Sequence, residues 1–489
     1  MSDRQSSRPG SAAQDGSAMA ELDGSAANLR DAAQTAPAGG GHVDHRPDGA
    51  GAHRAARLVG VTSLAHFLND GVVFFVPVIG DLLSQNHRVS TTMITAMLTT
   101  FYVVSAGSGL GIGLVADRLG RRGQMIAVGI ALLGVSLLGF YGALSLAGGA
   151  RSVLVILAAV LAGFGSAFYH PLGGSILQLG VPAGARGKAL GINGAFGSLG
   201  RALYPALFFL VATVGISKPT TTVVFGVLSI LAAAVVAFGL PADVTDPERR
   251  THAGKAVAPA AASAGVPAAA SAGAPAAAPV ADRKPVAVPL RSLINRSVVA
   301  LTGIAFFRSL GFIGVVSWIP IYLSSERHAG LSTSLGFTVT VMYAGGILGQ
   351  PLFGLLVDRF DKRLVLAIDS LGSAGGIFFF LSTSGLGAQA LLALFVFGVF
   401  TFSGFPLLMS LVADYVPKSS STTGNALVWG LGSTGGQALS PLVVGLLTGG
   451  SHANLGAAFA ILGGLIAATV AATPLLRRSA RSSRMALFG

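Results

Sequence analysis

Twelve stretches of mostly apolar residues, each long enough to cross a bilayer, constrain this chain more than any other feature. A membrane-spanning helix needs about 20 such residues. Charged residues make up 10% of the chain, whereas a soluble domain carries about 25%. The expected spans lie near 58–81, 93–116, 124–147, 153–178, 189–214, 221–241, 298–323, 334–357, 364–384, 388–413, 424–448 and 454–475. The sequence therefore predicts an all-α polytopic membrane protein.

The polar stretches divide these spans into six plus six. We expect a disordered cytoplasmic tail over 1–54, a six-helix bundle over 55–241 and a second bundle over 297–477. An Ala/Pro-rich linker over 242–296 joins the bundles, and a short tail over 478–489 ends the chain. Both low-complexity segments lack the large apolar residues that a packed core needs.

Lysine and arginine placement predicts the orientation. The predicted outside loops hold only Arg88, Arg151, Lys218 and Arg327, while the remaining loops are rich in basic residues. Cytoplasmic loops carry an excess of Lys and Arg, which gives both termini and the linker inside. The net charge of +13 then reflects topology, and we expect lipid but no nucleic acid as a partner.

The two halves also repeat in sequence. "GLVADRLGRRG" at 113–123 recurs as "GLLVDRFDKR" at 354–363, and "YHPLGGSILQLGVP" at 169–182 aligns without gaps with "GFPLLMSLVADYVP" at 404–417. Parallel repeats of six helices are the plan of transporters whose halves rock about a central site. No nucleotide loop, metal cluster or nucleophile motif is visible and there is no Cys, so no enzyme, metal or cofactor is expected.

Span count, central loop and repeated loop motif resemble the major facilitator superfamily. The loop motif places Asp117 and Arg118 at one predicted cytoplasmic span end, and Asp358 and Arg359 at the other. We expect these four residues to act in gating, through charge pairs that form or break as the halves rock. The neighbouring basic residues need no explanation beyond topology.

Shorter motifs resemble the fosmidomycin-resistance group of drug exporters within that superfamily. They are "HFLNDG" (66–71), "FYHPLGG" (168–174) and "AFFRSLGFIGVVSWIPIYL" (305–323). The resemblance implies proton-driven export of a small compound such as a phosphonate, from the bacterial inner membrane, by a chain that works as a monomer. The glycine-rich fifth span resembles the antiporter motif of this superfamily but lacks its Gly-Pro pair.

Midplane polar residues are the candidate site. His66, Asn69 and Asp70 share one face of the first span, and an Asp at that depth costs about 2.5–3.5 kcal/mol. Asp70 is therefore our candidate for carrying the proton, with His66, while Asn69 is a candidate for contacting substrate; the alternative is a polar cluster that only joins helices.

Two arginines lie equally deep, Arg201 in the fifth span and Arg308 in the seventh. Either can pair with Asp70 or bind an anion. We expect Arg308 to bind substrate and Arg201 to pair, both being substrate candidates; a fixed structural ion pair is the alternative.

His170-Pro171 interrupts the fourth span. Proline removes a backbone hydrogen bond and bends a helix, and histidine can accept a proton or donate to an anion near neutral pH. We therefore expect His170 in a cavity wall, for proton coupling and substrate binding, unless it only packs against a carbonyl. The predicted function is proton-coupled drug efflux by alternating access; an importer of a small organic anion is the alternative, and a non-transporting membrane sensor is a third reading.

Overall fold

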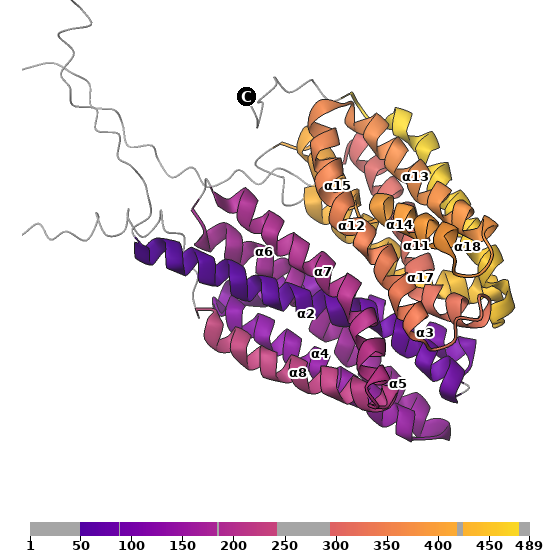
Figure 1. Cartoon of the computed structure of the whole chain (residues 1–489). Coiled ribbons are helices and arrows are strands. Elements are labelled where there is room, and N and C mark those ends of the chain that lie inside the picture. Colours follow the sequence, from indigo (N-terminus) through magenta and orange to yellow (C-terminus); the bar gives the residue numbers. More distant parts are fainter. Residues whose placement is uncertain (1–48, 88, 183–184, 242–293, 418–423, 479–489) are drawn as a thin grey trace, which may run out of the picture. The chain divides into compact units, whose positions relative to one another are not determined.

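The computed structural model describes residues 49–87, 89–182, 185–241, 294–417 and 424–478 (Figure 1). Within these ranges the chain is almost entirely helical and has no strand. Ten helices are long and apolar enough to cross a membrane. The predicted all-α polytopic class is confirmed, while the count of twelve crossings and the N-in, C-in orientation stay predictions.

In the described part of the first half there are seven helices. They are α2 (Gly49–His87), α3 (Thr91–Leu119), α4 (Arg122–Ser145), α5 (Gly148–Ser166), α6 (Tyr169–Gly180), α7 (Arg186–Thr213) and α8 (Lys218–Gly239). The helix α2 begins at Gly49, inside the segment predicted as a tail over 1–54, and the boundary at 54 stays a prediction. The apolar residues of this helix begin several residues after the helix itself, and the hydropathy pattern locates only the apolar residues.

The second half repeats this order. Its elements are α11 (Arg296–Ser325), α12 (Thr333–Arg359), α13 (Lys362–Ser382), α14 (Ala388–Thr401), α15 (Gly404–Tyr415), the π-helix η3 (Ala426–Thr434), α17 (Gly435–Thr448), the short turn η4 (His452–Asn454), α18 (Leu455–Ala468) and the 3₁₀ helix η5 (Thr469–Leu475). The chain separates into a short unit ending at Ala52 and a unit from His53 to Gly489. The predicted bundle boundaries at 241 and 297 stay predictions, and most of the linker and both distal tails lie outside the described residues.

Helix ends follow ordinary capping chemistry. The Ser90 side chain accepts a hydrogen bond from the Met93 amide at the start of α3, and Asn295 Oδ1 accepts from the Ser297 and Val298 amides at the start of α11. These contacts satisfy amides that have no partner within the helix. Gly120 ends α3 with φ 67°, a left-handed conformation that glycine adopts without strain.

Proline breaks one span in each half at the same place. α5 stops at Ser166 and α6 starts at Tyr169, just before Pro171; α14 stops at Thr401 and α15 starts at Gly404, just before Pro406. Each proline ring would clash with the carbonyl four residues earlier and has no amide to donate. A helix break therefore lies where His170-Pro171 was predicted to interrupt the span, while bending there stays a prediction; the break in the second half follows from the aligned motif.

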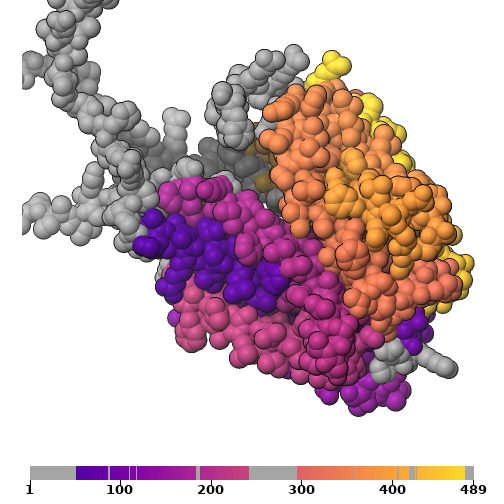
Figure 2. All heavy atoms as spheres, in the orientation of Figure 1, coloured from indigo at the N-terminus to yellow at the C-terminus, as the bar shows by residue number. Residues whose placement is uncertain are grey.

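Among other contacts, the two halves meet along α3 with α17 and along α7 with α12. Figure 2 shows the indigo-to-magenta and orange-to-yellow halves in contact on one face. At the end of α2, buried Asp81 accepts a hydrogen bond from Ser324 Oγ of α11, and Gln85 Nε2 lies 3.1 Å from the same hydroxyl. These contacts gather at ends predicted to lie outside.

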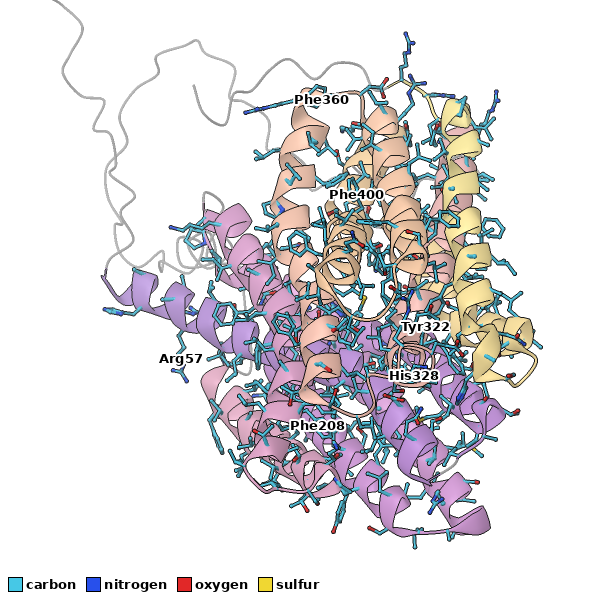
Figure 3. The ribbon with its side chains drawn as sticks, turned by 45° about the vertical axis from the view of Figure 1, so that its right-hand side comes forward. Arg57, Phe208, Tyr322, His328, Phe360 and Phe400 are labelled. Carbon is cyan, nitrogen blue, oxygen red and sulfur yellow. The ribbon has the colours of Figure 1, made fainter. Side chains whose placement is uncertain are left out.

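Side chains fill the space between helices. Phe208 is buried in a cluster of rings of the first half, where it packs against Phe75 with ring centroids 4.7 Å apart (Figure 3). Phe360 lies exposed just beyond the end of α12 in the same view. The apolar side chains that remain exposed on the spans, such as Phe238 and Leu446, suit a lipid environment.

Candidate functional site

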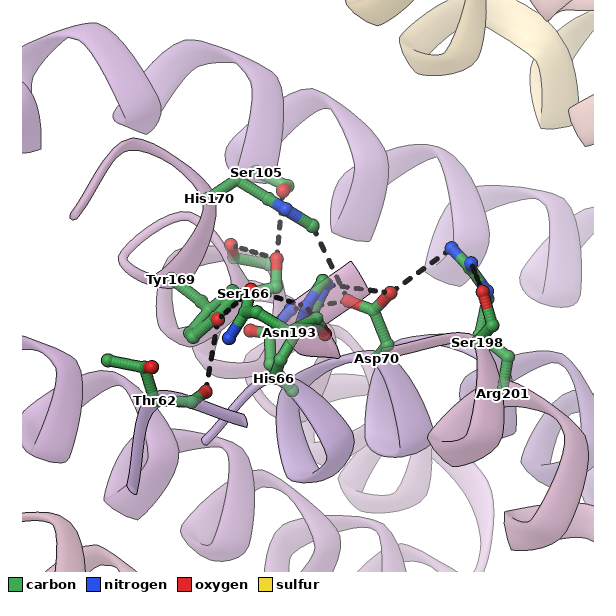
Figure 4. Close-up of polar contacts among 12 residues, drawn as sticks. Thr62, His66, Asp70, Ser105, Ser166, Tyr169, His170, Asn193, Ser198 and Arg201 are labelled. Carbon is green, nitrogen blue, oxygen red and sulfur yellow. Dashed lines mark hydrogen bonds and ion pairs between the residues drawn. The ribbon is translucent and has the colours of Figure 1, made fainter. Parts of the chain in front are cut away.

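Asp70 is the centre of a buried polar cluster in the first half (Figure 4). Its side chain, on α2, is 1% exposed, and its Oδ2 lies 3.1 Å from Nη1 of Arg201 on α7. The predicted pairing of Arg201 with this carboxylate is therefore present. Removing an ion pair of this kind from water is costly unless both partners keep further hydrogen bonds.

The predicted proton and substrate residues surround the same carboxylate. His66 Nε2 lies 3.3 Å from Oδ2 and His170 Nε2 lies 3.4 Å from Oδ1, while Asn69 Nδ2 donates to Oδ1 at 3.0 Å. His170 is 63% exposed and His66 13%. His170 is thus the most exposed of these residues, and its place in a cavity wall stays a prediction.

Glycines let α7 approach α2 closely enough to build this cluster. A Cβ on Gly200 would lie 2.2 Å from the Phe67 carbonyl oxygen, and one on Gly197 would lie 2.4 Å from His66 Nε2. On α2, a Cβ at Gly71 would lie 2.3 Å from the Tyr204 ring. Small residues allow such backbone contact between membrane helices, so the predicted glycine-rich fifth span positions Arg201 beside Asp70.

Two further residues, Tyr169 and Asn193, were missed by the sequence analysis. His66 Nδ1 lies 2.8 Å from the Asn193 main-chain oxygen, and the Tyr169 hydroxyl lies 2.9 Å from Asn193 Oδ1 and 3.0 Å from the Thr62 main-chain oxygen. The Tyr169 ring stacks on His66 at 4.5 Å. Because a carbonyl only accepts, Nδ1 of His66 is the donor, and its Nε2 points at Asp70. A polar residue in an apolar stretch, such as Asn193, was the available signal.

Arg201 also contacts the second half of the chain. Its guanidinium lies 5.3 Å from the ring centroid of Phe74 on α2 and 5.3 Å from that of Phe402, at the break between α14 and α15. Its Nη2 donates to Ser198 Oγ at 2.7 Å. Cation–π contacts of this kind contribute about 0.5–2 kcal/mol. The arginine therefore joins the carboxylate of one half to the helix break of the other.

Arg308 lies in a different ion pair. Its Nη2 is 2.5 Å from Asp369 Oδ2 of α13, and the two side chains are 5% and 0% exposed. Within the described residues, Arg308 Nε and Asp369 Oδ1 have no hydrogen-bond partner. Asp369 was missed, although a single carboxylate in the predicted span 364–384 was a signal of the same kind as Asp70. The substrate role predicted for Arg308 stays a prediction.

The predicted gating residues lie where expected, in the last turns of α3 and α12. Arg118 and Arg359 are exposed, and the side chains of Asp117 and Asp358 lie outside the described part of the structure. Their gating role stays a prediction.

Two neighbouring basic residues, predicted to serve topology alone, form ion pairs near the same helix ends. Lys362 Nζ lies 2.7 Å from Asp414 Oδ2, and Arg363 Nη2 lies 2.9 Å from Asp361 Oδ2. The hydrogen bond from Arg363 holds the pKa of Asp361 below its usual range.

Only one group of described residues offers ligand atoms close enough for a metal ion, namely His66, Asp70 and His170, within 4.8 Å of one another. A divalent cation there would also face the Arg201 guanidinium, 3.1 Å from the same carboxylate. Repulsion between two cations at so short a distance disfavours metal. A proton, or an anion held by Arg201, fits the charges better.

The fold is that of a helical membrane protein of two repeated halves, with this cluster of ionisable residues in the first half. The family model of the Major Facilitator Superfamily matches residues 61–428 and again 329–486. The chain belongs to this superfamily, and it is a transporter rather than an enzyme.

Curated relatives match over part of their length. The chain is 30% identical over 174 residues to the cis,cis-muconate transport protein of Acinetobacter baylyi, covering 35% of this chain and 40% of that protein. It is 30% identical over 138 residues to the uncharacterized MFS-type transporter YcaD of Escherichia coli, covering 28% and 34%. An uncharacterized Archaeoglobus fulgidus protein is 33% identical over 142 residues, or 29% and 64%. The matches thus span less than two thirds of each relative.

Solved transporters share the fold. The inward open xylose transporter XylE from E. coli superposes with a TM-score of 0.65 at 14% identity, covering 87% of this chain and 97% of that one. A bacterial homologue of the human lysosomal transporter Spinster, inward-facing and occupied, gives 0.60 at 16% identity, covering 86% and 96%. At these identities the likeness concerns the fold alone.

Proposed function

We propose that this chain is a secondary active transporter that couples the movement of a small organic anion to protons by alternating access. One observation carries the proposal: the buried Asp70–Arg201 pair, 3.1 Å apart, beside the solvent-exposed His170. The site joins a titratable carboxylate, a permanent cation and a route for protons. Ionisable residues at such depth are expensive and mark ion or substrate pathways.

The coupling follows from competition for Arg201. When Asp70 is ionised, it occupies the guanidinium and excludes another anion. When Asp70 is protonated, the guanidinium keeps its charge and is free to bind a carboxylate or phosphonate through paired hydrogen bonds. His66 and His170 pass the proton to Asp70 in this scheme, and Asn69 holds Oδ1 or contacts the substrate.

This competition makes proton and anion bind together. A proton that raises the affinity for the anion has its own affinity raised by the same factor. Two ligands that favour each other move in the same direction, so an inward proton gradient would drive uptake of the anion. The similarity to a protein named for cis,cis-muconate transport supports an organic acid as cargo.

Efflux is the second candidate, and the motifs shared with the fosmidomycin-resistance group favour it. "HFLNDG" and "FYHPLGG" contain the very residues, His66, Asp70 and His170, that form the cluster. Export against an inward proton gradient requires the opposite linkage, in which substrate binding lowers the affinity for protons. A substrate that bonds to ionised Asp70 through its own donors, while displacing Arg201, would meet this requirement.

The contacts between halves support alternating access. Hydrogen bonds near Asp81, Gln85 and Ser324 join the halves at the ends predicted to face outside. Phe402 brings the second half against Arg201 near the midplane. We propose that these contacts hold an inward-facing state in the bacterial inner membrane, with gating at Arg118 and Arg359, and that a monomer suffices.

Transport by purified protein in liposomes tests the proposal. An inward proton gradient is imposed, and accumulation of radiolabelled cis,cis-muconate and of fosmidomycin is followed, with the gradient then reversed. Proton-driven accumulation of either compound that Asp70→Asn abolishes supports the proposal, and the gradient that drives it separates uptake from efflux.

Arg296→Gln is the matched control, because Arg296 is an exposed residue in the first turn of α11. Transport that Asp70→Asn leaves unchanged would refute the assignment of Asp70. Accumulation that ignores the proton gradient would refute proton coupling.

A further inference from the structure

The ion pair of the second half lies next to the helix break that also contacts Arg201. A Cβ on Gly404, the first residue of α15, would lie 2.9 Å from Arg308 Nη1. Phe402, two residues earlier, faces the Arg201 guanidinium at 5.3 Å. Two residues of chain span at most about 7 Å. One short segment, 402–404, therefore lies against both arginines.

The Arg308–Asp369 pair is poorly satisfied for a structural pair. Arg308 Nε and Asp369 Oδ1 are buried without a hydrogen-bond partner in the described part of the chain. Buried polar groups in native proteins are nearly always hydrogen-bonded, and a buried ion pair is stable only when its remaining donors and acceptors are satisfied. The unpartnered atoms point to another partner, in another state of the transport cycle.

We propose that Arg308 is a second anion-binding group, and that the substrate is a dianion, held by Arg201 at one end and by Arg308 at the other. The inference rests on the proposed function and extends it to a substrate class. The two arginines come from opposite halves of the chain, so a dianion joins the halves through its two ends. A dicarboxylate has this chemistry.

Charge balance gives the number of protons. Before substrate binds, two arginines face two carboxylates, so these four groups sum to zero charge, and the histidines keep the same charge throughout the cycle. When a dianion takes both arginines, the sum stays zero only if Asp70 and Asp369 each accept one proton. An unbalanced charge at this depth is costly. Each dianion therefore moves with two protons, and the cycle carries no net charge.

Matched acids test the substrate class. The full chain is purified in detergent, and thermal stabilisation is measured with cis,cis-muconate against sorbate, its monoacid counterpart, and with glutarate against pentanoate. A dianion is expected to bind at least about tenfold more tightly than its monoanion, because it gains a second set of charge-assisted hydrogen bonds. Arg308→Gln should remove this preference and Arg296→Gln should not.

The voltage dependence of transport tests the proton count independently. In liposomes clamped by potassium and valinomycin, the proton-driven flux of the dianion should not change with voltage in the wild type. Asp369→Asn keeps the shape of the protonated side chain but carries no proton, so each cycle moves one net negative charge and the flux should respond to voltage.

Several results would overturn the proposal. They are equal or tighter binding of the monoanions, binding of neither dianion, or a dianion flux that depends on voltage in the wild type. A proton-driven monoanion flux that needs Asp70 but not Arg308 would refute the dianion while leaving the proposed function intact. If the wild type shows no proton-driven flux of any anion, both the dianion proposal and the proposed function are refuted.

Discussion

The two buried ion pairs differ in how completely they are satisfied. Asp70 forms an ion pair with Arg201, accepts a hydrogen bond from Asn69 and lies beside two histidines. Arg201 also donates a hydrogen bond to Ser198 and forms cation–π contacts with two aromatic rings. Arg308 and Asp369 have each other, and one donor and one acceptor stay unpartnered in the described structure. The first pair lies beside His170, whose side chain is exposed, whereas both side chains of the second pair are buried. A buried pair that solvent reaches can exchange protons, while a sealed one has to wait for the halves to move.

Neutralising the two carboxylates separates the pairs most strongly. Asp70→Asn should strongly lower the proton-driven accumulation ratio of an anion, because it removes the proton linkage through Arg201 and leaves only the linkage through the buried Asp369. Asp369→Asn should keep accumulation driven by protons, with one proton fewer. Substrate exchange in counterflow without a gradient is the control and should survive in both. An equal loss of accumulation in both variants would contradict the expected difference between Asp70 and Asp369.

The free energy of unfolding should fall more on loss of Asp369 than on loss of Asp70, the reverse of the order expected for transport. Asp369→Ala leaves Arg308 buried without a partner and should lower the free energy of unfolding by about 3–5 kcal/mol. Asp70→Ala should cost about 1–3 kcal/mol, because Arg201 keeps the Ser198 hydroxyl and solvent contact. Denaturant unfolding in detergent measures both. The double variant Asp369→Leu/Arg308→Met should recover most of the loss; no recovery would argue that the loss comes from packing.

The close helix approach around each arginine can be compared with glycine variants. Gly200→Ala meets a main-chain oxygen that cannot move and should cost about 1–3 kcal/mol of stability. Gly404→Ala meets only the end of the Arg308 side chain, which can shift, so it should cost less and alter anion affinity instead. Gly191→Ala, with open space around it, is the neutral control. A larger stability loss for Gly404→Ala would show that Arg308 is rigidly held.

The aromatic contact joins Arg201 to the second half of the chain. Phe402→Leu removes one cation–π contact and should weaken the hold on Arg201 by about 0.5–2 kcal/mol. The expected result is a modest rise in the rate of exchange between inward- and outward-facing states, measured by cross-linking across the outer ends. Phe164→Leu, whose ring meets Phe168 within the first half, should leave that rate unchanged. Identical effects of the two variants would remove Phe402 from the coupling.

The exposed pair Asp361–Arg363 gives the smallest expected effect. The pKa of Asp361 is held below its usual range by the Arg363 hydrogen bond. A lowered pKa stabilises the fold above the unfolded-state value, and this contribution is lost as the pH falls through the folded-state pKa. Since the pair is solvent-exposed, the contribution should stay below about 1 kcal/mol. Asp361→Asn should flatten the acid limb of stability slightly; a large change would contradict the assignment as a surface pair.

The fold could be predicted from the sequence because its signals are long. Runs of about 20 apolar residues and a repeated loop motif predicted the helices and their order, and His170-Pro171 predicted the break in the fourth span. The break before Pro406 was not predicted, although the aligned motif carried the signal. The start of α2 at Gly49 was not predicted, because a helix can continue past the apolar stretch into polar residues where hydropathy gives no signal.

The site was predicted in part. Asp70, His66 and His170 were found because charge and proline are conspicuous in an apolar run, and Arg201 proved to be the partner of Asp70. The partner of Arg308 was missed, since pairing depends on which helices become neighbours: α11 and α13 both contact α18, a relation that no local pattern encodes. Tyr169 and Asn193 were missed for the same reason.

The most direct test of the central claim is the proton exchange that accompanies substrate binding. The purified chain is placed in weakly buffered detergent solution, and cis,cis-muconate is added while the pH is recorded. The account predicts uptake of about two protons per dianion, falling to about one in Asp70→Asn, because the anion takes Arg201 only when Asp70 is protonated and Asp369 accepts the other proton. Binding with release of protons, or with no exchange, would contradict the claim that proton and anion share this ion pair.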